Sequence, residues 1–333
     1  MHCKPISVII PSVMLPKKIL NLIIPESSAN ERLDQALAKL LPEYSRTQFQ
    51  EWIEKGQVQV DGALVKAKYK LKGGEAIQIE ATIKKETFWL PENISLNIVY
   101  EDDDLLIINK PIGMVVHPGA GNQTNTLLNA LLHHDPALQM LPRAGIIHRL
   151  DKDTSGLLIV AKKPAALKII SHQLKKRTIL REYQAIVYGK LLSGGKIDAP
   201  IDRHPLQRKR MCVSETGRPA ITHYRIMEKF RAHTHLKVKL ETGRTHQIRV
   251  HMAHIHHPII GDITYGGRTK LSKGMSAEII QLFRQFNHQA LHAFKIGLIH
   301  PTTEEYIEWE IDLPNDMQHL LVALKEDSLR NKS

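Results

Sequence analysis

The chain contains 333 residues, 42% of them hydrophobic, and we expect two domains because single cores rarely grow beyond about 250–300 residues. Lys and Arg number 46 against 34 Asp and Glu, and the net charge of +12 favours a polyanionic partner, nucleic acid first. No apolar run reaches the roughly 18 residues of a membrane-spanning helix, and two cysteines without a CxxC pair support neither a disulfide framework nor a cysteine zinc site. A reducing cytoplasm fits this composition.

The first 27 residues differ in character from the rest. Lys4 precedes a short apolar stretch that prolines interrupt, and a basic pair stands where a cleavage site would need small residues. We therefore reject a secretion signal. We expect residues 1–27 to be a disordered or loosely held extension, with Met14 as an alternative start.

A small module follows. Apolar residues recur at helical spacing from Leu33 to Leu41, which predicts one helix, and a capping box at Ser45 and Gln48 predicts a second. The alternating segment Val58–Val60 then leads into Asp61-Gly62, the strongest short-range signal of a β-hairpin. The pattern indicates two helices followed by a hairpin.

Lysines alternate beyond the hairpin, at positions 66, 68, 70 and 72. In a strand they would project to one face, where they could meet phosphates. A solvated lysine-rich edge that resists aggregation explains the pattern equally well. We assign residues 28–82 to the module and residues 83–92, rich in charge and containing Pro91, to a linker.

Strands dominate the larger domain, which we place at 93–325, with a C-terminal tail at 326–333. Helices are predicted at Thr126–His133 and Pro164–Lys176. Strands are predicted at Leu105–Asn109, Tyr183–Tyr188, His223–Met227, Leu236–Leu240, Leu291–Ile299 and Tyr306–Ile311. Because turns separate most of these strands, we expect a mixed or antiparallel sheet and the α+β class. No GxGxxG or P-loop motif appears, which argues against a dinucleotide or P-loop nucleotide site.

The most distinctive segment is a polar turn between the apolar runs Ile146-Ile147 and Leu157–Ala161, which predict two strands. The turn carries Asp151 and Asp153 beside two cations. A carboxylate kept ionised by neighbouring positive charge suits nucleophilic or base chemistry. On spacing alone, the interpretation that the carboxylates merely accept bonds from turn amides is favoured.

Two further segments concentrate positive charge. The loop 203–210 places four fixed charges in eight residues, and a loop so charged is either solvated or grips phosphate. With the overall charge, phosphate is favoured. Farther on, Gly243 ends a strand and Thr245 can cap a helix whose positive end lies near Arg244 and His246, a suitable place for an anion.

Histidines continue this second segment without predicting a metal site. His251 and His254 are three residues apart and His256-His257 follow, but HExxH is absent and no carboxylate or cysteine follows at ligand spacing. We expect a site without metal or cofactor.

The nine residues from His148 to Gly156 resemble the signature of the RNA pseudouridine synthases of the large-subunit ribosomal class. Three further segments match the same family, Arg181–Ala185, Arg244–His251 and Gln289–Ala293. The stretch Glu31–Glu80 is similar to the S4-type RNA-binding module. The resemblance implies a pseudouridine synthase fold with a mixed, largely antiparallel central sheet, and a small N-terminal S4-type module.

In that family the aspartate of the signature is the essential catalytic residue, here Asp151. The resemblance implies cofactor-free isomerisation of uridine to pseudouridine in 23S ribosomal RNA, with Asp151 attacking the nucleotide or stabilising a ribosyl cation. Arg249 would pair with Asp151, Tyr183 would stack on the target base and help remove the C5 proton, and Arg149 would fill the gap left by the flipped uridine. Taken alone, Tyr183 reads as an ordinary strand aromatic and Arg149 as a surface cation.

We predict RNA contacts from Arg149, His148, Arg244, His246, Arg203, Arg208, Lys209, Arg210, Arg46, Lys66, Lys68 and Lys70. The implied partner is 23S ribosomal RNA or an assembling large subunit, with the chain monomeric, cytoplasmic and independent of membranes. One alternative is a synthase of this family that acts on other ribosomal or transfer RNA uridines. Another is a non-catalytic RNA-binding assembly factor, which would not need Asp151, and a third is a histidine-metal hydrolase, which would need zinc.

Overall fold

The computed structural model describes residues 17–42, 44–82, 89–119, 121–267, 271 and 274–330. The chain divides into two compact units, Met1–Phe88 and Trp89–Ser333, and each has its own hydrophobic core. This confirms the expectation of one small and one large domain. Within the described ranges, no helix combines the length and the apolar character needed to cross a bilayer.

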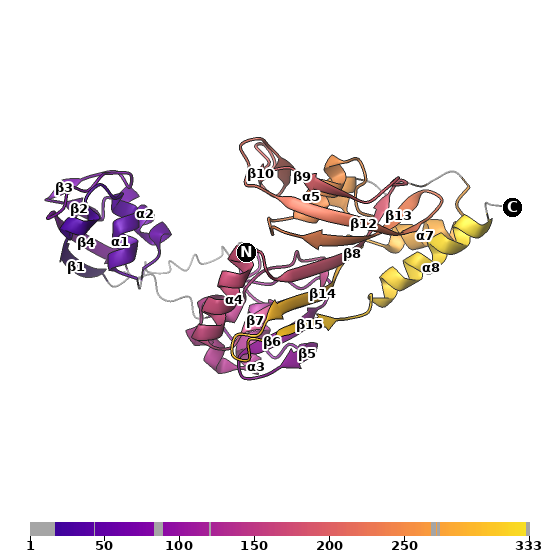
Figure 1. The fold of residues 1–333 in the computed structure, drawn as a ribbon, viewed down its shortest axis with the longest axis horizontal. Coiled ribbons are helices and arrows are strands. Elements are labelled where there is room, and N and C mark those ends of the chain that lie inside the picture. The colour runs from indigo at the N-terminus through magenta and orange to yellow at the C-terminus, as the bar shows by residue number, and fades with distance from the viewer. Residues whose placement is uncertain are drawn as a thin grey trace, which may run out of the picture. The chain divides into compact units, whose positions relative to one another are not determined.

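The N-terminal unit combines two helices with a four-stranded antiparallel sheet of order β1-β4-β2-β3 (Figure 1). Its elements are β1 (Lys17–Ile23), the 3-10 turn η1 (Glu26–Ser28), α1 (Leu33–Leu40), α2 (Arg46–Glu54), β2 (Val58–Val60), β3 (Ala63–Leu64) and β4 (Ala76–Thr82). The predicted capping box is present, because the Ser45 hydroxyl accepts the Gln48 N–H and the Gln48 side chain accepts the Ser45 N–H. Phe49 and Trp52 are buried at the centre of this unit.

Two expectations for this unit are wrong. β1 pairs with β4 along its whole length and Ile24 is buried, so residues 17–27 belong to the module and are no loose extension. The predicted lysine strand is absent, because the chain turns at residues 67–68 and only Lys70 forms an isolated bridge, to Arg32. The four lysines are nevertheless exposed. Residues 1–16, including Met14, lie outside the described part of the chain.

The larger unit is built on a nine-stranded sheet of order β5-β6-β7-β14-β8-β13-β12-β9, with β15 paired to β14. Every pair is antiparallel except β7 with β14, which confirms a mixed, largely antiparallel sheet. The strands are β5 (Ile98–Glu101), β6 (Leu105–Lys110), β7 (Ser155–Ala161), β8 (Leu180–Tyr188), β9 (Gly195–Asp198), β12 (Ile221–Lys229), β13 (His233–Leu240), β14 (Leu291–Ile299) and β15 (Tyr306–Glu310). A separate hairpin joins β10 (Ile201–Arg203) and β11 (Met211–Val213).

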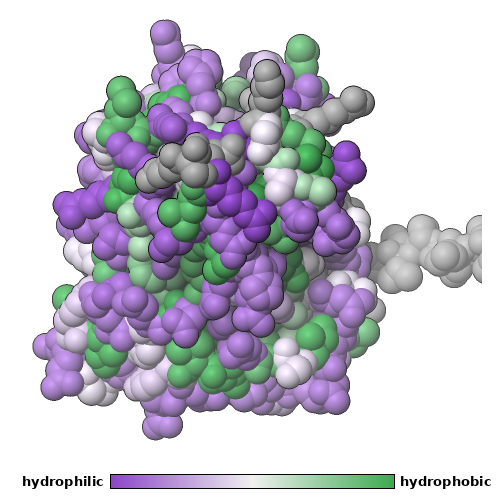
Figure 2. All heavy atoms as spheres, turned by 90° about the vertical axis from the view of Figure 1, so that its right-hand side faces the viewer, coloured by the Kyte–Doolittle hydropathy of each residue, from purple (hydrophilic) through white to green (hydrophobic). Residues whose placement is uncertain are grey.

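The larger unit also contains helices and short 3-10 turns. The helices are α3 (Leu127–His134), α4 (Pro164–Lys176), α5 (Gln247–His254), α6 (Ile263–Gly266), α7 (Ala277–Gln285) and α8 (Asn315–Arg330), with 3-10 turns η2 (Pro136–Met140) and η3 (Pro142–Gly145). Leu106 and Ile108 of β6 pack with α3, whereas Leu105 and Ile107 pack with α4 on the opposite face. The strands here are continuous apolar runs because both faces are covered. On the face in Figure 2, by contrast, hydrophobic residues are interspersed among hydrophilic ones.

The ends of the larger unit differ from those expected. Residues 89–92 are no linker, because Glu92 donates its backbone N–H to the Asn129 carbonyl and accepts the Asn125 N–H at its carboxylate. Residues 83–88 lie outside the described residues. α8 continues to Arg330 and buries Asp327 against Arg231, so residues 326–330 are helix and no tail.

Candidate active site

Asp151 lies in the loop between η3 and β7, and close backbone packing holds this loop. The predicted strand at Ile146-Ile147 is reduced to an isolated bridge between Ile146 and Val160. Gly145 has φ +74°, and a Cβ there would lie 1.9 Å from the Ala161 carbonyl oxygen, so only glycine fits. Position 145 therefore sets how closely the loop that carries Asp151 approaches β7.

Lys110 fixes the same loop through hydrogen bonds to its backbone. Its Nζ donates to three carbonyl oxygens, those of Pro111 (2.7 Å), Met114 (3.1 Å) and Lys152 (3.0 Å). Burial lowers the pKa of Lys110 to about 8, although the charges of Asp153 and Asp151 oppose the shift. Lys110 thus ties the turn-rich segment after β6 to the residue that follows Asp151.

Arg249 of α5 joins two carboxylates. Its Nη1 donates to Oδ2 of Asp151 at 2.9 Å, and its Nε and Nη2 donate to the two oxygens of Asp262 at 2.7 and 3.0 Å. Asp262 is buried and the ring centroid of Tyr265 lies 5.0 Å from the guanidinium carbon. Burial alone would lower the pKa of Arg249, but bonding to Asp262 and the charges of Asp262 and Asp151 raise it above its ordinary value. The cation facing Asp151 is therefore permanent and fixed in orientation.

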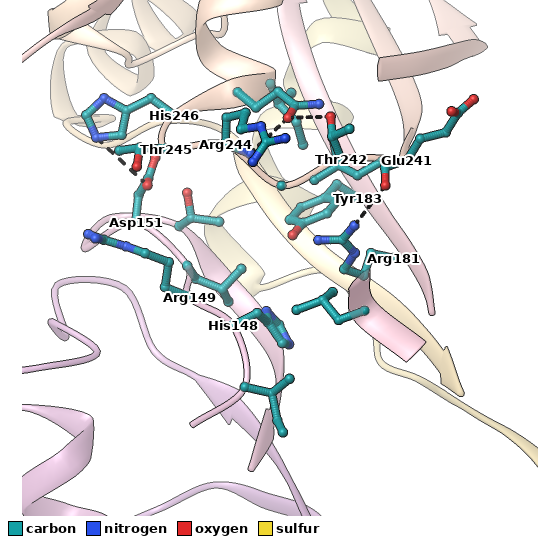
Figure 3. Close-up of a pocket in the computed structure, with 18 of the residues that line it drawn as sticks. His148, Arg149, Asp151, Arg181, Tyr183, Glu241, Thr242, Arg244, Thr245 and His246 are labelled. Atoms are coloured by element: carbon teal, nitrogen blue, oxygen red, sulfur yellow. Dashed lines mark hydrogen bonds and ion pairs between the residues drawn. The ribbon is translucent and has the colours of Figure 1, made fainter. Parts of the chain in front are cut away.

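His246 faces the other oxygen of Asp151, with Nε2 at 3.9 Å from Oδ1 (Figure 3). Burial lowers the pKa of His246, while the charge of Asp151 opposes the shift. Its Nδ1 lies 2.8 Å from the Tyr265 hydroxyl, which accepts the Met211 N–H. Because that hydroxyl already accepts one bond, it can donate its proton to Nδ1, which leaves the Nε2 proton directed at Asp151.

Tyr183 of β8 lines the same cavity of about 480 Å³ as Asp151 and Arg249. Figure 3 shows Tyr183 and Asp151 in it. Only 6% of the residue is exposed. Burial raises the pKa of Tyr183; the charge of Arg181 opposes this shift and that of Asp151 adds to it. The three residues predicted to act together therefore share one cavity, and their catalytic roles stay predictions.

Four of the predicted RNA-contacting residues also line this cavity, namely Arg149, His148, Arg244 and His246. Arg149 is exposed. His148 accepts the Ile159 N–H at Nε2, and burial lowers its pKa to about 3. It is therefore neutral and supports the loop, so we expect no charged phosphate contact from it.

The other predicted RNA contacts lie elsewhere. Arg203, Arg208, Lys209 and Arg210 belong to the β10–β11 hairpin, and the Arg210 guanidinium lies 5.3 Å from the Tyr265 ring centroid. Arg46, Lys66, Lys68 and Lys70 belong to the N-terminal unit. In that unit Arg46 donates to the buried carboxylate of Asp34 at 2.9 Å.

Sequence reasoning missed Asp262, Tyr265, Lys110 and the position of Arg181. Gly261-Asp262 reads as a turn followed by a helix cap, and Asp262 does cap α6 by accepting the Tyr265 N–H. The sequence pattern therefore predicts the cap at Asp262, but it gives no indication that Asp262 also bonds Arg249. The predicted Thr245 cap is wrong, since His246 occupies the N-cap position with φ +55° and caps with no side-chain bond.

Metal binding finds no support in the described ranges, where no group of three or more His, Cys, Asp or Glu side chains is arranged to hold an ion. His251 of α5 instead makes hydrogen bonds within the protein. It contacts the Thr222 hydroxyl and the Ala199 carbonyl, both at 2.9 Å.

Comparisons with known proteins agree with this geometry. The family model described as RNA pseudouridylate synthase matches residues 104–254, and the S4 domain model matches residues 31–77. The ribosomal large subunit pseudouridine synthase D of Pasteurella multocida is 55% identical over 303 residues, which are 90% of this chain and 93% of the relative. The chain belongs to the RNA pseudouridylate synthase family. The synthase D of Yersinia pestis is 52% identical over 310 residues, 93% of this chain and 95% of the relative.

Solved structures support the fold of the synthase. Human RNA Pseudouridylate Synthase Domain Containing 4 superposes with a TM-score of 0.55 at 24% identity, covering 69% of this chain and 93% of its own. Human RNA Pseudouridylate Synthase Domain Containing 1 gives a TM-score of 0.50 at 26% identity, covering 70% and 96%. The protein is thus an RNA pseudouridine synthase, an isomerase with an added S4 domain, and the interpretations as a non-catalytic assembly factor or a metal hydrolase are not favoured.

Proposed function

We propose that the enzyme converts uridine to pseudouridine in 23S ribosomal RNA, with Asp151 as the catalytic carboxylate. One observation carries the assignment of Asp151: its carboxylate is paired with a fixed arginine inside a basic cavity that Tyr183 also lines. The ribosomal substrate is supported by the names of relatives 50–55% identical to this chain, which are called ribosomal large subunit pseudouridine synthase D. We further propose that the enzyme acts in the cytoplasm, as a monomer and without a cofactor.

The reaction requires little more than a positioned carboxylate. The bond from ribose C1′ to uracil N1 breaks, the base turns, C1′ bonds to C5, and the C5 proton is lost while N1 gains a proton, so atoms balance without redox change or net water. Asp151 attacks the nucleotide or stabilises positive charge developing on the ribose, and either role needs the carboxylate form. Arg249 stabilises that form, and Asp262 prevents the guanidinium from turning away.

Tyr183 supplies the surface for the flipped base. Taking a uridine out of its stack costs energy, and stacking on an aromatic ring in the pocket offsets part of it. Because the pKa of Tyr183 is raised by burial, the ring carries a neutral hydroxyl at physiological pH. The neutral hydroxyl can donate a hydrogen bond that orients the base after it turns; to take up the C5 proton it would first have to pass its own proton to another group.

RNA recognition is divided between the cavity and two further basic surfaces. The β10–β11 hairpin and the N-terminal unit carry the remaining predicted contacts, and in both the cations are exposed or half-buried. Contacts of this kind bind phosphate and position the RNA without reading its sequence.

The test maps pseudouridines by carbodiimide-dependent reverse-transcription stops in ribosomal RNA from cells with and without the gene. Cells that carry Asp151→Asn should lack the same pseudouridines as the deletion, while the purified variant binds RNA within a small factor of wild type. Asp153→Asn is the matched control, because Asp153 lies two residues away and has no bond to Arg249. Turnover by Asp151→Asn would refute the catalytic assignment, and stops that vanish from transfer RNA instead would refute the substrate.

A further inference from the structure

The active-site cavity continues past Asp151 toward the end of α4. The far end is lined by Lys175, Arg177, Arg181 and Arg244, and Glu241 supplies the one carboxylate there among the described lining residues. Figure 3 shows Arg181, Arg244 and Glu241. Over the whole cavity the lining comprises six Lys and Arg side chains and two carboxylates, and Asp151 is already paired with Arg249. Four of the six cations therefore line the far end of the cavity, beside a single carboxylate.

Arg181 is the most unusual of these cations. It is 6% exposed, its Nη2 donates one long bond of 3.4 Å to the Glu241 carbonyl, and its Nε has no partner in the described part of the chain. No described carboxylate lies within ion-pair distance of it. A buried cation without a counter-charge is costly and is normally paired or serves a ligand. Since no described residue supplies a negative charge to Arg181, we infer that a bound ligand supplies it.

The neighbouring backbone is shaped to admit this guanidinium. A Cβ at Gly243 would lie 2.6 Å from Nη1 of Arg181. The atom in conflict is the tip of a flexible side chain, so an alanine would displace the guanidinium and leave the backbone where it is. Glycine at position 243 therefore makes room for Arg181, next to Arg244 on the same loop.

The surrounding cations are only loosely neutralised. Arg177 lies 3.8 Å from the Glu241 carboxylate, which also bonds His223 at 2.5 Å. Arg244 donates its Nε to the Pro219 carbonyl at 3.1 Å, and its pKa is lowered by burial and by the charges of Arg218 and Arg177. Like charges held this close repel one another, so an anion between them would stabilise the cluster.

We propose that Arg181, Arg177 and Arg244, with Lys175 at the rim, form a phosphate subsite that binds a phosphodiester group adjacent to the target nucleotide. Planar guanidinium groups match phosphate oxygens through paired hydrogen bonds. The subsite opens into the cavity that contains Asp151 and Tyr183, so a nucleotide held there extends its own backbone toward the arginines. The inference rests on the proposed function, since only an RNA substrate places a phosphodiester at that point.

The first experiment measures kcat and KM on a short synthetic RNA that carries one uridine the enzyme converts. Arg181→Gln and Gly243→Ala should each raise KM by roughly tenfold to a hundredfold, the effect of removing a charge-assisted hydrogen bond, while kcat changes much less. Gly243→Ala keeps every charge, so its effect reports the position of the guanidinium. Lys175→Gln should raise KM by a smaller factor, and Lys168→Gln, exposed on the same helix outside the cavity, should leave it unchanged.

The second experiment combines the Arg181→Gln variant with changes in the RNA backbone. Methylphosphonates, which are uncharged, replace the phosphate on either side of the target uridine one at a time. In wild type, one replacement should raise KM as much as Arg181→Gln does, and in the Arg181→Gln enzyme the same replacement should add almost nothing. If the two effects multiply at both positions, the phosphate subsite is refuted. If wild type makes no pseudouridine in any RNA, the proposed function fails instead, so the two failures are distinguishable.

Discussion

Asp262 accepts hydrogen bonds from two nitrogens of Arg249, which leaves Nη1 of the guanidinium to face Asp151 at 2.9 Å. The fork geometry of arginine makes this arrangement rigid, because rotation about Nε would break both bonds to Asp262 at once. Asp262 does not line the cavity, yet it fixes the position of the positive charge beside Asp151, the carboxylate that we propose to be catalytic.

Replacing Asp262 by Asn should therefore lower kcat by about ten- to a hundredfold, because an amide N–H would face the Arg249 donors and turn the guanidinium. The affinity for RNA should stay within a factor of about two, since the phosphate-binding side chains are unchanged. Single-turnover rates at saturating enzyme and a binding isotherm separate the two quantities.

Asp327→Asn is the matched control for that experiment. Asp327 is also buried and accepts bonds from Nε and Nη2 of an arginine, Arg231, at 2.8 and 3.3 Å, but neither residue lines the active-site cavity. Both variants should lose stability, by about 3–5 kcal/mol if the buried pair is broken. Equal losses of kcat in the two variants would show that Asp262 acts only through stability.

Tyr265 connects the β10–β11 hairpin to the site, because its hydroxyl accepts the Met211 N–H while its ring lies against Arg249. Tyr265→Phe keeps the ring and removes the hydroxyl. Amide hydrogen exchange in residues 201–213 should then accelerate, and the affinity for RNA should fall several-fold. The same change removes the bond to His246 Nδ1, so kcat should also fall, but by less than in a variant that loses the ring. Tyr265→Leu, which also removes the ring beneath Arg249, should lower kcat further. Unchanged exchange in the hairpin of the Phe variant would contradict this connection.

The elements that sequence predicts well are those with local signals. Helix α4 has the predicted bounds, Pro164–Lys176, because proline is favoured at a helix start and the chain leaves the helix through Arg177 at φ +62°. β1 was missed because its partner β4 lies some sixty residues farther along the chain, and long-range pairing has no local signature. The same holds for α8, whose last turn is fixed by Asp327 against Arg231.

The site divides in the same way. The signature around Asp151 and the segment containing Arg249 are visible as motifs, and the structure brings both to one cavity. The pairing of Arg249 with Asp262 is invisible, since thirteen residues and a change of direction at Gly261 separate them. The buried state of Arg181 is invisible too, because an arginine in a strand is ordinarily expected to be exposed.

Lys110 makes the stability of the larger unit depend on pH. Burial lowers its pKa in the folded state from 10.5 to about 8, so between these values the unfolded chain holds a proton that the folded chain has released. Stability therefore rises with pH across this window, by about 3 kcal/mol for the full shift. Hydrogen exchange of β6 and β7 amides in urea, compared between wild type and Lys110→Met, should show this rise in wild type only. A difference between the two proteins that stays constant from pH 7 to about pH 10 would contradict the burial argument.

In the N-terminal unit, the buried carboxylate of Asp34 fixes the positions of two arginines. It accepts bonds from Arg32 at 2.9 and 3.0 Å, from Arg46 at 2.9 Å and from Gln50 at 2.6 Å. Burial would raise the pKa of Asp34, but these hydrogen bonds lower it to about 2, so the carboxylate is ionised at every working pH. The guanidinium groups are thereby held in place before any RNA arrives.

Asp34→Asn should weaken RNA binding, because Arg46 would no longer be held in its position. It should do so although the loss of a carboxylate makes the net charge of the protein more positive by one. The slope of log Kd against log salt should fall by about 0.7–0.9 for each phosphate that the variant no longer neutralises, with kcat at saturating RNA unchanged. Glu54→Gln makes the same change in charge at an exposed position of α2 and should leave binding equal or slightly tighter. If Asp34→Asn binds as tightly as Glu54→Gln, net charge alone governs this unit and the ordering of Arg46 by Asp34 has no part in recognition.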